Sequence, residues 1–105
     1  MDKIAIVIPN YNGLRYLQIC FDALEKQTYK NFHVYFVDNG SDDTSCSYVS
    51  QHYSDTSIIA LDKNYGFSYA VNVGIRQSTE PYVILLKNYT LRSVSLKKYF
   101  PAVQS

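Results

Sequence analysis

The 105-residue sequence predicts an α/β protein, with three α/β/α layers around a mainly parallel sheet of four strands. Short continuous apolar runs alternate with segments whose apolar residues recur at helical spacing, and this alternation repeats three times. Each apolar run ends in a loop rich in Asn, Asp and Gly, which is typical of crossovers between parallel strands. Apolar residues make up 47% of the chain, which is enough for one core.

The first half of the chain predicts two strands and the helix between them. Ile4–Ile8 is a continuous apolar run with four β-branched residues, typical of a strand that is buried on both faces. From Leu14 to about Gln27 the apolar residues recur at helical spacing, which indicates an amphipathic helix, and Asn12 is placed to cap it. A second apolar run, Phe32–Val37, predicts the second strand.

The second half continues the alternation with shorter elements. Asp42 or Asp43 can cap a Ser-rich helix that runs to about residue 53. A third strand, a third helix and a fourth strand follow, at Ser57–Leu61, Phe67 to about Gln77 and Tyr82–Leu86. We therefore expect one domain over residues 1–90. Beyond Thr90 the pattern fades, and residues 91–105 are expected to form a tail or a short helix around Val94–Phe100.

Composition argues against several classes of protein. Ten basic and nine acidic residues leave a net charge of +1, which calls for neither nucleic acid nor an anionic membrane as partner. Cys20 and Cys46 match no metal spacing; a disulfide between them stays open, but two thiols in a reducing compartment fit better. No segment approaches the roughly 20 apolar residues of a membrane span, and the start of the chain lacks a signal peptide's apolar run. The expected location is the cytoplasm.

Four polar loops follow the predicted strands. Because parallel α/β sheets bind ligands at the carboxyl ends of their strands, these loops are the candidate site. They are Pro9–Gly13, Asp38–Asp43, Asp62–Phe67 and Lys87–Thr90. Each loop by itself is explained by ordinary turn chemistry, whereas four such loops at one edge of the sheet predict a binding site for a polar ligand. The GxGxxG, P-loop and nucleophile-elbow motifs are absent, and we expect His33 and His52 to be packed or surface side chains rather than catalysts.

Three segments resemble the N-terminal, nucleotide-sugar-binding part of a family 2 glycosyltransferase with the GT-A fold. They read IVIPNYNGLRYLQICFDALEKQTYKNFHVYFVDNGSDDTS, NYGFSYAVNVGI and PYVILLKNYT. The three segments occur in the family's order and spacing, so the resemblance extends from Ile4 to about Thr90. The resemblance implies a Rossmann-like half of a GT-A fold that binds a UDP-, GDP- or dTDP-linked sugar. It also implies that the full-length enzymes transfer this sugar with inversion at the anomeric carbon.

The resemblance also implies roles for individual residues. Tyr11 would pack beside the base, and Asp38 would accept a hydrogen bond from it. The loop from Asn64 to Phe67 would close over the nucleotide and sugar, and Asn88 would lie near the ribose. The full set of implied nucleotide-binding residues is Pro9, Asn10, Tyr11, Asn12, Asp38, Asn39, Asn64, Gly66, Phe67, Lys87 and Asn88.

The expected metal-binding motif departs from the family pattern. The family places Asp-x-Asp or Asn-Asn-Asp after the fourth strand, and the last acid coordinates Mg²⁺ or Mn²⁺. Here the motif is Lys87-Asn88-Tyr89, and the neutral phenol of Tyr89 is a poor ligand for a hard divalent cation. A metal is therefore expected for the family, whereas these residues argue against it here. The ammonium of Lys87 either neutralises a diphosphate directly or is exposed without a role.

The family's catalytic base belongs to a C-terminal half that the resemblance does not reach, so no catalytic residue is assigned. Sugar transfer is not expected from these residues alone. Three explanations stay open: a fragment of a longer enzyme, a natural truncation, or a degenerate domain that binds nucleotide or a partner. The rival to donor binding is a non-catalytic module that forms a homodimer or binds a partner through an exposed fourth strand. Membrane association of a full-length form also stays open.

Overall fold

The computed structural model describes residues 3–88 and 92–97. Its elements are β1 (Ile4–Asn10), α1 (Leu14–Glu25), β2 (Phe32–Asp38), α2 (Ser45–His52), β3 (Ser57–Ala60), α3 (Phe67–Gln77), β4 (Tyr82–Lys87) and β5 (Arg92–Lys97). The three expected helices and four expected strands are all present. Their bounds lie close to those that the hydrophobic periodicity predicts.

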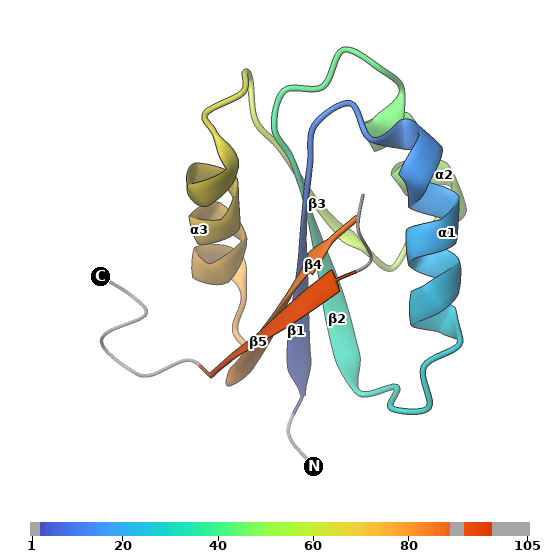
Figure 1. Ribbon diagram of the computed structural model, residues 1–105, viewed down its shortest axis with the longest axis vertical. Coiled ribbons are helices and arrows are strands. Elements are labelled where there is room, and N and C mark those ends of the chain that lie inside the picture. The colour runs from blue at the N-terminus through green and yellow to red at the C-terminus, as the bar shows by residue number, and fades with distance from the viewer. Residues whose placement is uncertain (1–2, 89–91, 98–105) are drawn as a thin grey trace.

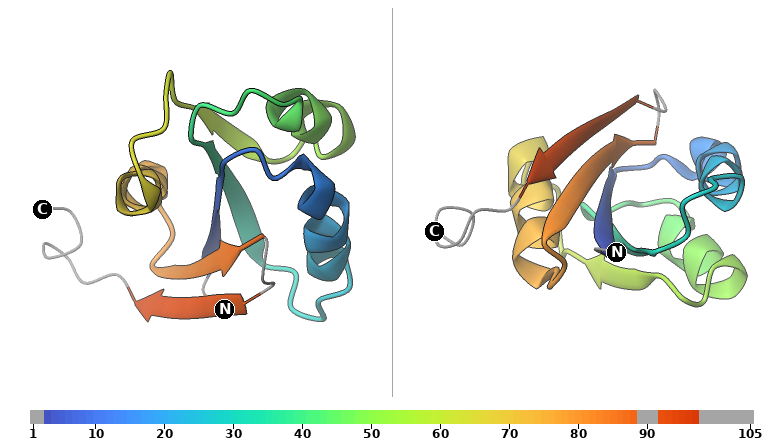
Figure 2. Two further views of the ribbon diagram at one scale, coloured as in Figure 1. Left: turned by 45° about the horizontal axis from the view of Figure 1, so that its top comes forward. Right: turned by 90° about the horizontal axis from the view of Figure 1, so that it is seen from below.

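The sheet has the strand order β3-β2-β1-β4-β5, and its first four strands are parallel. Helices α1 and α2 cover one face and α3 covers the other (Figures 1 and 2). Side chains of β1 alternate between the two layers, since Ile6 and Ile8 pack in the core under α1 and α2, whereas Ala5 and Val7 pack in the core under α3. The predicted three-layer α/β fold with four parallel strands is confirmed.

Residues 92–97 form a strand and not the expected tail or short helix. This strand, β5, pairs antiparallel with β4 from Lys87↔Arg92 to Tyr82↔Lys97. The sequence Ser-Val-Ser-Leu at 93–96 alternates polar and apolar residues with the two-residue period of a strand, which outweighs the weaker helical pattern. The expectation of an exposed fourth strand was therefore wrong, because β5 covers that edge. Residues 98–100 of the expected helix lie outside the described residues.

Helix α3 approaches the sheet closely at Gly74. A Cβ atom at this position would lie 2.5 Å from Cγ1 of Val7 and 3.1 Å from Cγ2 of Val37. Only a glycine allows this helix to pack so near β1 and β2. The close packing fixes the height of α3, and with it the position of the loop and first turn at its amino end.

The pairing of β1 defines where a ligand can bind. β1 pairs with β2 as far as Asn10↔Asp38, but its pairing with β4 ends at Val7↔Leu85. The last residues of β1 and β4 therefore diverge at the carboxyl edge. The chain also reverses its direction of winding here, with β2 on one side of β1 and β4 on the other. Open α/β sheets bind ligands at this kind of switch point.

Both cysteines are free thiols. Burial raises the pKa of Cys20 to about 11. Burial, together with the nearby carboxylate of Asp38, also raises the pKa of Cys46 to about 11, so both thiols stay protonated and weakly nucleophilic at neutral pH. Among the helices that the structure describes, none has the length and apolar character that crossing a membrane requires.

Candidate functional site

Three of the predicted site residues end adjacent strands and are joined by hydrogen bonds. Asn88, one residue beyond β4, donates from Nδ2 to Oδ1 of Asn10 at 2.7 Å, and Asn10 donates from Nδ2 to Oδ1 of Asp38 at 2.9 Å. These side chains are only 5%, 2% and 4% exposed, respectively. With Ser41 they form what we call the polar floor, which spans the gap between the diverging ends of β1 and β4.

Ser41 fixes the carboxylate of Asp38. Its backbone amide donates to Oδ2 at 2.9 Å and its hydroxyl donates to Oδ1 at 2.7 Å. With the bond from Asn10, Asp38 accepts three of the roughly four hydrogen bonds that a carboxylate can take. An N–H group of a ligand that reached Asp38 would share an oxygen with one of these donors. Asp38 therefore holds its own loop as well as offering an acceptor.

Gly13, the residue before α1, lies directly over the polar floor. A Cβ atom on Gly13 would lie 2.5 Å from Oδ1 of Asn10 and 2.8 Å from Nδ2 of Asn88. A larger residue would thus displace one of the two amides. The glycine of the first loop is needed for this close approach.

The loops after β1 and β2 are linked to each other by Asn12. This residue has a φ of 51°, in the left-handed region that Asn tolerates better than most residues. Its Oδ1 accepts from the amides of Asp42 at 2.8 Å and Asp43 at 3.3 Å. The expectation that Asn12 caps α1 was wrong, since the first turn of α1 is bonded by Asp43, whose Oδ2 accepts from the amide of Leu14 at 3.2 Å.

Asp43 stays ionised in this position. Burial alone would raise its pKa, but hydrogen bonds from the hydroxyl and amide of Ser45 and from the amide of Leu14 outweigh burial and lower the pKa. Its carboxylate therefore joins the starts of α1 and α2. The expectation that Asp42 or Asp43 caps α2 was wrong, because Thr44 is the N-cap residue of α2 and Asp43 bonds the amide of Ser45. The link from Asp43 to α1 was missed because the two helices are brought together only by the fold.

Asn39 links the loop after β2 to the loop before α3. It is 5% exposed, donates from Nδ2 to the carbonyl of Gly66 at 3.0 Å, and accepts on Oδ1 from the amide of Tyr65 at 2.9 Å. Within the second loop, Oδ1 of Asn64 accepts from the amide of Gly66 at 2.8 Å. Both Asn39 and Asn64 thus shape the loop around Gly66, whose φ of 94° favours glycine.

Pro9 lies within β1 and not in the loop that follows it. It is buried and pairs with Val37 of β2, so β1 extends through Asn10. A proline is tolerated here because the pairing of β1 with β4 has already ended at Val7, and no ladder hydrogen bond is lost on that side.

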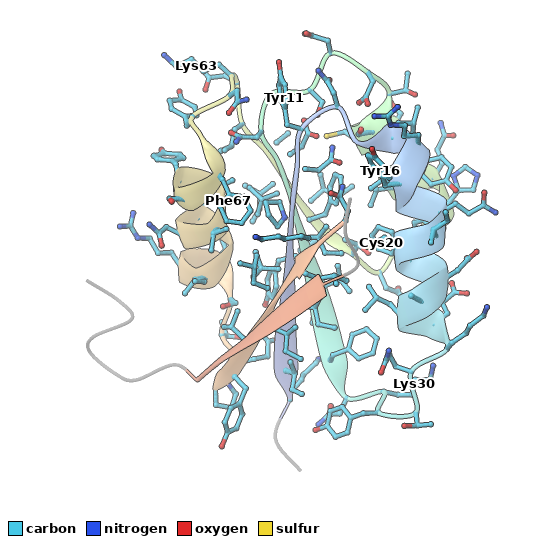
Figure 3. All side chains as sticks on the ribbon, in the orientation of Figure 1. Tyr11, Tyr16, Cys20, Lys30, Lys63 and Phe67 are labelled. Carbon is cyan, nitrogen blue, oxygen red and sulfur yellow. The ribbon has the colours of Figure 1, made fainter. Side chains whose placement is uncertain are left out.

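Two exposed aromatic side chains flank the edge of the sheet. Tyr11 is 49% exposed and extends outward from the loop after β1 (Figure 3). Phe67, the first residue of α3, is 43% exposed. The ammonium of Lys87, at the end of β4, lies 5.3 Å from the centroid of the Phe67 ring, which is within the range of a cation–π contact.

The described part of the edge does not fit a divalent cation. No three His, Cys, Asp or Glu side chains converge within residues 3–88 and 92–97. Asp38 accepts hydrogen bonds from Asn10 and Ser41, and Asp43 accepts hydrogen bonds from Leu14 and Ser45. β4 ends in the cation Lys87, which would repel a metal ion. Tyr89 lies outside the described residues, and its phenol is not a ligand that Mg²⁺ or Mn²⁺ prefers.

The fold and this edge define an α/β domain with a candidate site at the switch point of a parallel sheet. Comparison with known proteins identifies the family. The family model described as "Glycosyl transferase family 2" matches residues 5–87, and the chain belongs to this family.

Curated relatives agree with this membership. Over 86 residues the chain is 37% identical to "Glycosyltransferase GlyA" of Streptococcus pneumoniae, an alignment that covers 78% of this chain and 12% of the relative. It is 35% identical over 81 residues to "Glycosyltransferase AglE" of Haloferax volcanii, covering 72% of this chain and 27% of the relative. The chain therefore spans less than a third of the length of each of these relatives.

Solved structures share the fold. A mannosyltransferase from Pyrobaculum calidifontis in complex with GDP-Man and Mn²⁺ has a TM-score of 0.73 at 21% identity, over 83% of this chain and 27% of that protein. S. aureus TarS in complex with UDP has a TM-score of 0.76 at 24% identity, over 82% of this chain and 27% of the other. These likenesses establish a Rossmann-like GT-A fold for the described domain.

Proposed function

We propose that this chain binds a nucleotide-sugar donor at the carboxyl edge of its sheet and is the donor-binding part of a glycosyltransferase. The observation that supports this most strongly is the polar floor, because it spans the switch point with buried, mutually bonded side chains. The proposed nucleotide-contacting residues are Pro9, Asn10, Tyr11, Asn12, Asp38, Asn39, Asn64, Gly66, Phe67, Lys87 and Asn88.

The chemistry of the edge favours certain bases. Asp38 offers only acceptor oxygens, so it suits the imide or amide N–H of uracil, thymine or guanine. The exposed ring of Tyr11 provides a surface on which such a base can stack. These features support a UDP-, GDP- or dTDP-linked sugar as donor. Asn88 lies at the opposite end of the polar floor, and we assign it to the ribose.

We propose that sugar transfer needs more than these residues. Direct displacement with inversion requires a base that deprotonates the acceptor hydroxyl, and we assign this role to no residue of this chain. The chain would therefore bind donor without transferring sugar by itself. Sugar transfer by the purified chain to any acceptor would contradict this part of the proposal. The cytoplasmic location and any membrane association of a longer form stay predictions, which fractionation of source cells would test.

The test of donor binding is calorimetric titration of the purified chain with UDP, GDP and dTDP. We expect at least one of them to bind, and Asp38→Asn to weaken that binding about tenfold or more, because the charged acceptor is lost. Asp55→Asn is the matched control, since Asp55 is exposed and lies just before β3, at the amino ends of the parallel strands. Failure of all three nucleotides to bind the wild-type chain would refute the proposal.

A rival role, association with a second copy of the chain, is favoured by one observation. An apolar groove of about 210 Å³ lies beside β4 on the α1 side of the sheet. Its lining is Ile4, Ile6, Leu24, Gln27, Tyr29, Phe32, Ile84 and Leu86. The edges of the described sheet, β3 and β5, are further surfaces for a homodimer. Light scattering of the chain and of Ile84→Glu tests this role: a dimer that the substitution dissociates would support it, and a monomer would exclude it.

A further inference from the structure

We propose that the ammonium of Lys87 neutralises the diphosphate of the donor in place of a divalent cation, and that the ring of Phe67 positions this ammonium. The inference rests on the proposed function, because it names the part of the donor that Lys87 contacts. It goes beyond that function by predicting that nucleotide binding at this edge is independent of metal.

Lys87 and Phe67 come together from two elements on one face of the sheet. Val83 belongs to the core under α3 and Leu86 to the core under α1, so the alternation along β4 puts Lys87 on the α3 face. Phe67 begins α3 on that same face. Its ring is 43% exposed, so core packing does not account for its place, and the Nζ of Lys87 lies 5.3 Å from the ring centroid. The contact holds the ammonium at the carboxyl edge.

The charges along the edge are arranged by strand. β2 ends in the carboxylate of Asp38, whereas β4 ends in the ammonium of Lys87. The amino end of α3 is bonded to Asn39 through Gly66 and contacts Lys87 through Phe67. It has no acidic residue in its first turn and no side-chain cap, so its dipole adds positive potential near Lys87. A nucleotide fits this pattern in one direction only, with the N–H groups of its base toward Asp38 and its phosphates toward Lys87.

A lysine and a divalent cation are alternatives at this position. Two cations a few ångströms apart repel each other, and the carboxylates of Asp38 and Asp43 are engaged by hydrogen bonds from Ser41 and Leu14. A point charge on a flexible stem also suits a diphosphate, whose oxygens it can follow. The residues at this edge thus do not fit the Mn²⁺ that is present in the mannosyltransferase of the same fold. Lys87 supplies the compensating charge itself.

The experiment compares a nucleoside diphosphate with its nucleoside, using whichever of UDP, GDP and dTDP binds the wild-type chain. Titrations are run in EDTA and, separately, with Mn²⁺. We expect the diphosphate to bind more tightly than the nucleoside in EDTA, and Mn²⁺ to add less than about twofold. Lys87→Met should weaken diphosphate binding about tenfold to 100-fold, the range expected for a hydrogen bond to a charged group, and leave nucleoside binding unchanged.

Matched variants separate the proposed role from general effects on charge and folding. Lys26→Met removes an exposed lysine at the far end of α1, away from the four loops, and should leave the diphosphate affinity unchanged. Lys87→Arg should keep most of the affinity, because the charge remains. For the positioning residue, Phe67→Leu should weaken diphosphate binding several-fold without changing nucleoside binding, and Phe67→Tyr should restore it. Thermal unfolding confirms that each variant is folded.

The outcomes distinguish this inference from the function on which it rests. If diphosphate binding requires Mn²⁺, or survives Lys87→Met undiminished, the inference is wrong while donor binding stands. If Phe67→Tyr is as weak as Phe67→Leu, the ring does not position the lysine. If neither nucleoside nor diphosphate binds the wild-type chain, the proposed function fails, and the inference fails with it.

Discussion

Asn88 ties the end of β4 to the end of β1. It is 5% exposed and donates at 2.7 Å to Oδ1 of Asn10. Asn88→Ala would leave this buried oxygen without its donor, so we expect the free energy of unfolding to fall by about 1–3 kcal/mol. Urea denaturation measures the change. Asn72→Ala, at an exposed position of α3, is the control and should change stability by less than about 0.5 kcal/mol.

Glu80 gives the fold a dependence on acid pH. Burial alone would raise its pKa, but hydrogen bonds from the hydroxyl of Tyr35, at 2.9 Å, and from the amide of Thr79, at 3.1 Å, outweigh burial and lower it. A carboxyl group with a lowered pKa stabilises the fold above its unfolded-state pKa of about 4.5. This stability is lost as the pH falls through the lower, folded-state pKa.

Carboxyl groups titrate between about pH 5 and pH 3. We therefore expect the free energy of unfolding to fall less over this range in Glu80→Gln than in the wild-type chain. Tyr35→Phe should also reduce it, because the phenol is a donor that lowers the pKa of Glu80. Urea unfolding midpoints at several pH values measure the slope of stability against pH. Glu25→Gln, which removes an exposed carboxylate, is the matched control. Equal slopes in wild type and Glu80→Gln would contradict the assignment.

Among the elements, α3 depends on a glycine for its packing. In Gly74→Ala the new methyl group would lie 2.5 Å from Cγ1 of Val7, and overpacking of a core typically costs about 1–3 kcal/mol. Alanine favours a helix by about 1 kcal/mol over glycine, which offsets only part of this cost. We expect a net loss of up to about 2 kcal/mol in the free energy of unfolding.

The double variant Gly74→Ala with Val7→Ala tests the same contact. Val7→Ala removes the methyl group that clashes, so the double variant should be more stable than the sum of the two single changes predicts. Simple additivity of the two changes would show that the helix shifts freely and that Gly74 is not needed for its position.

The elements also show what a sequence can predict for this fold. Hydrophobic periodicity is local, and it located β1 through β4 and all three helices with nearly their observed bounds. The predicted topology placed the polar loops at the carboxyl ends of the strands, so Asn10, Asp38 and Asn88 were predicted to lie at the same edge. What joins them is not local: Asn88 bonds to a residue 78 positions earlier in the chain. The use of Asn12 and Asp43 as links between loops was missed for the same reason.

For the molecule as a whole, β5 decides whether β4 is an internal strand or an edge. All six residues of β5 pair with β4, which would otherwise expose its backbone beside the buried side chains Val83 and Leu85. The hydrophobic pattern before Thr90 suggested a domain of residues 1–90. The observed pairing indicates that the cooperative unit extends at least to Lys97.

Truncation tests this extent of the folding unit. A chain that ends at residue 90 loses the β4–β5 ladder, and we expect its Tm to fall by more than about 5 °C, since a loss of only 1 kcal/mol shifts the Tm of a domain of this size by about 4–8 °C. It should also self-associate, because an unpaired edge beside apolar side chains recruits other strands. A chain that ends at Lys97 keeps the whole ladder and is the control. If the shorter chain stays monomeric with an unchanged Tm, β5 does not stabilise the domain, and residues 1–90 fold as an independent unit.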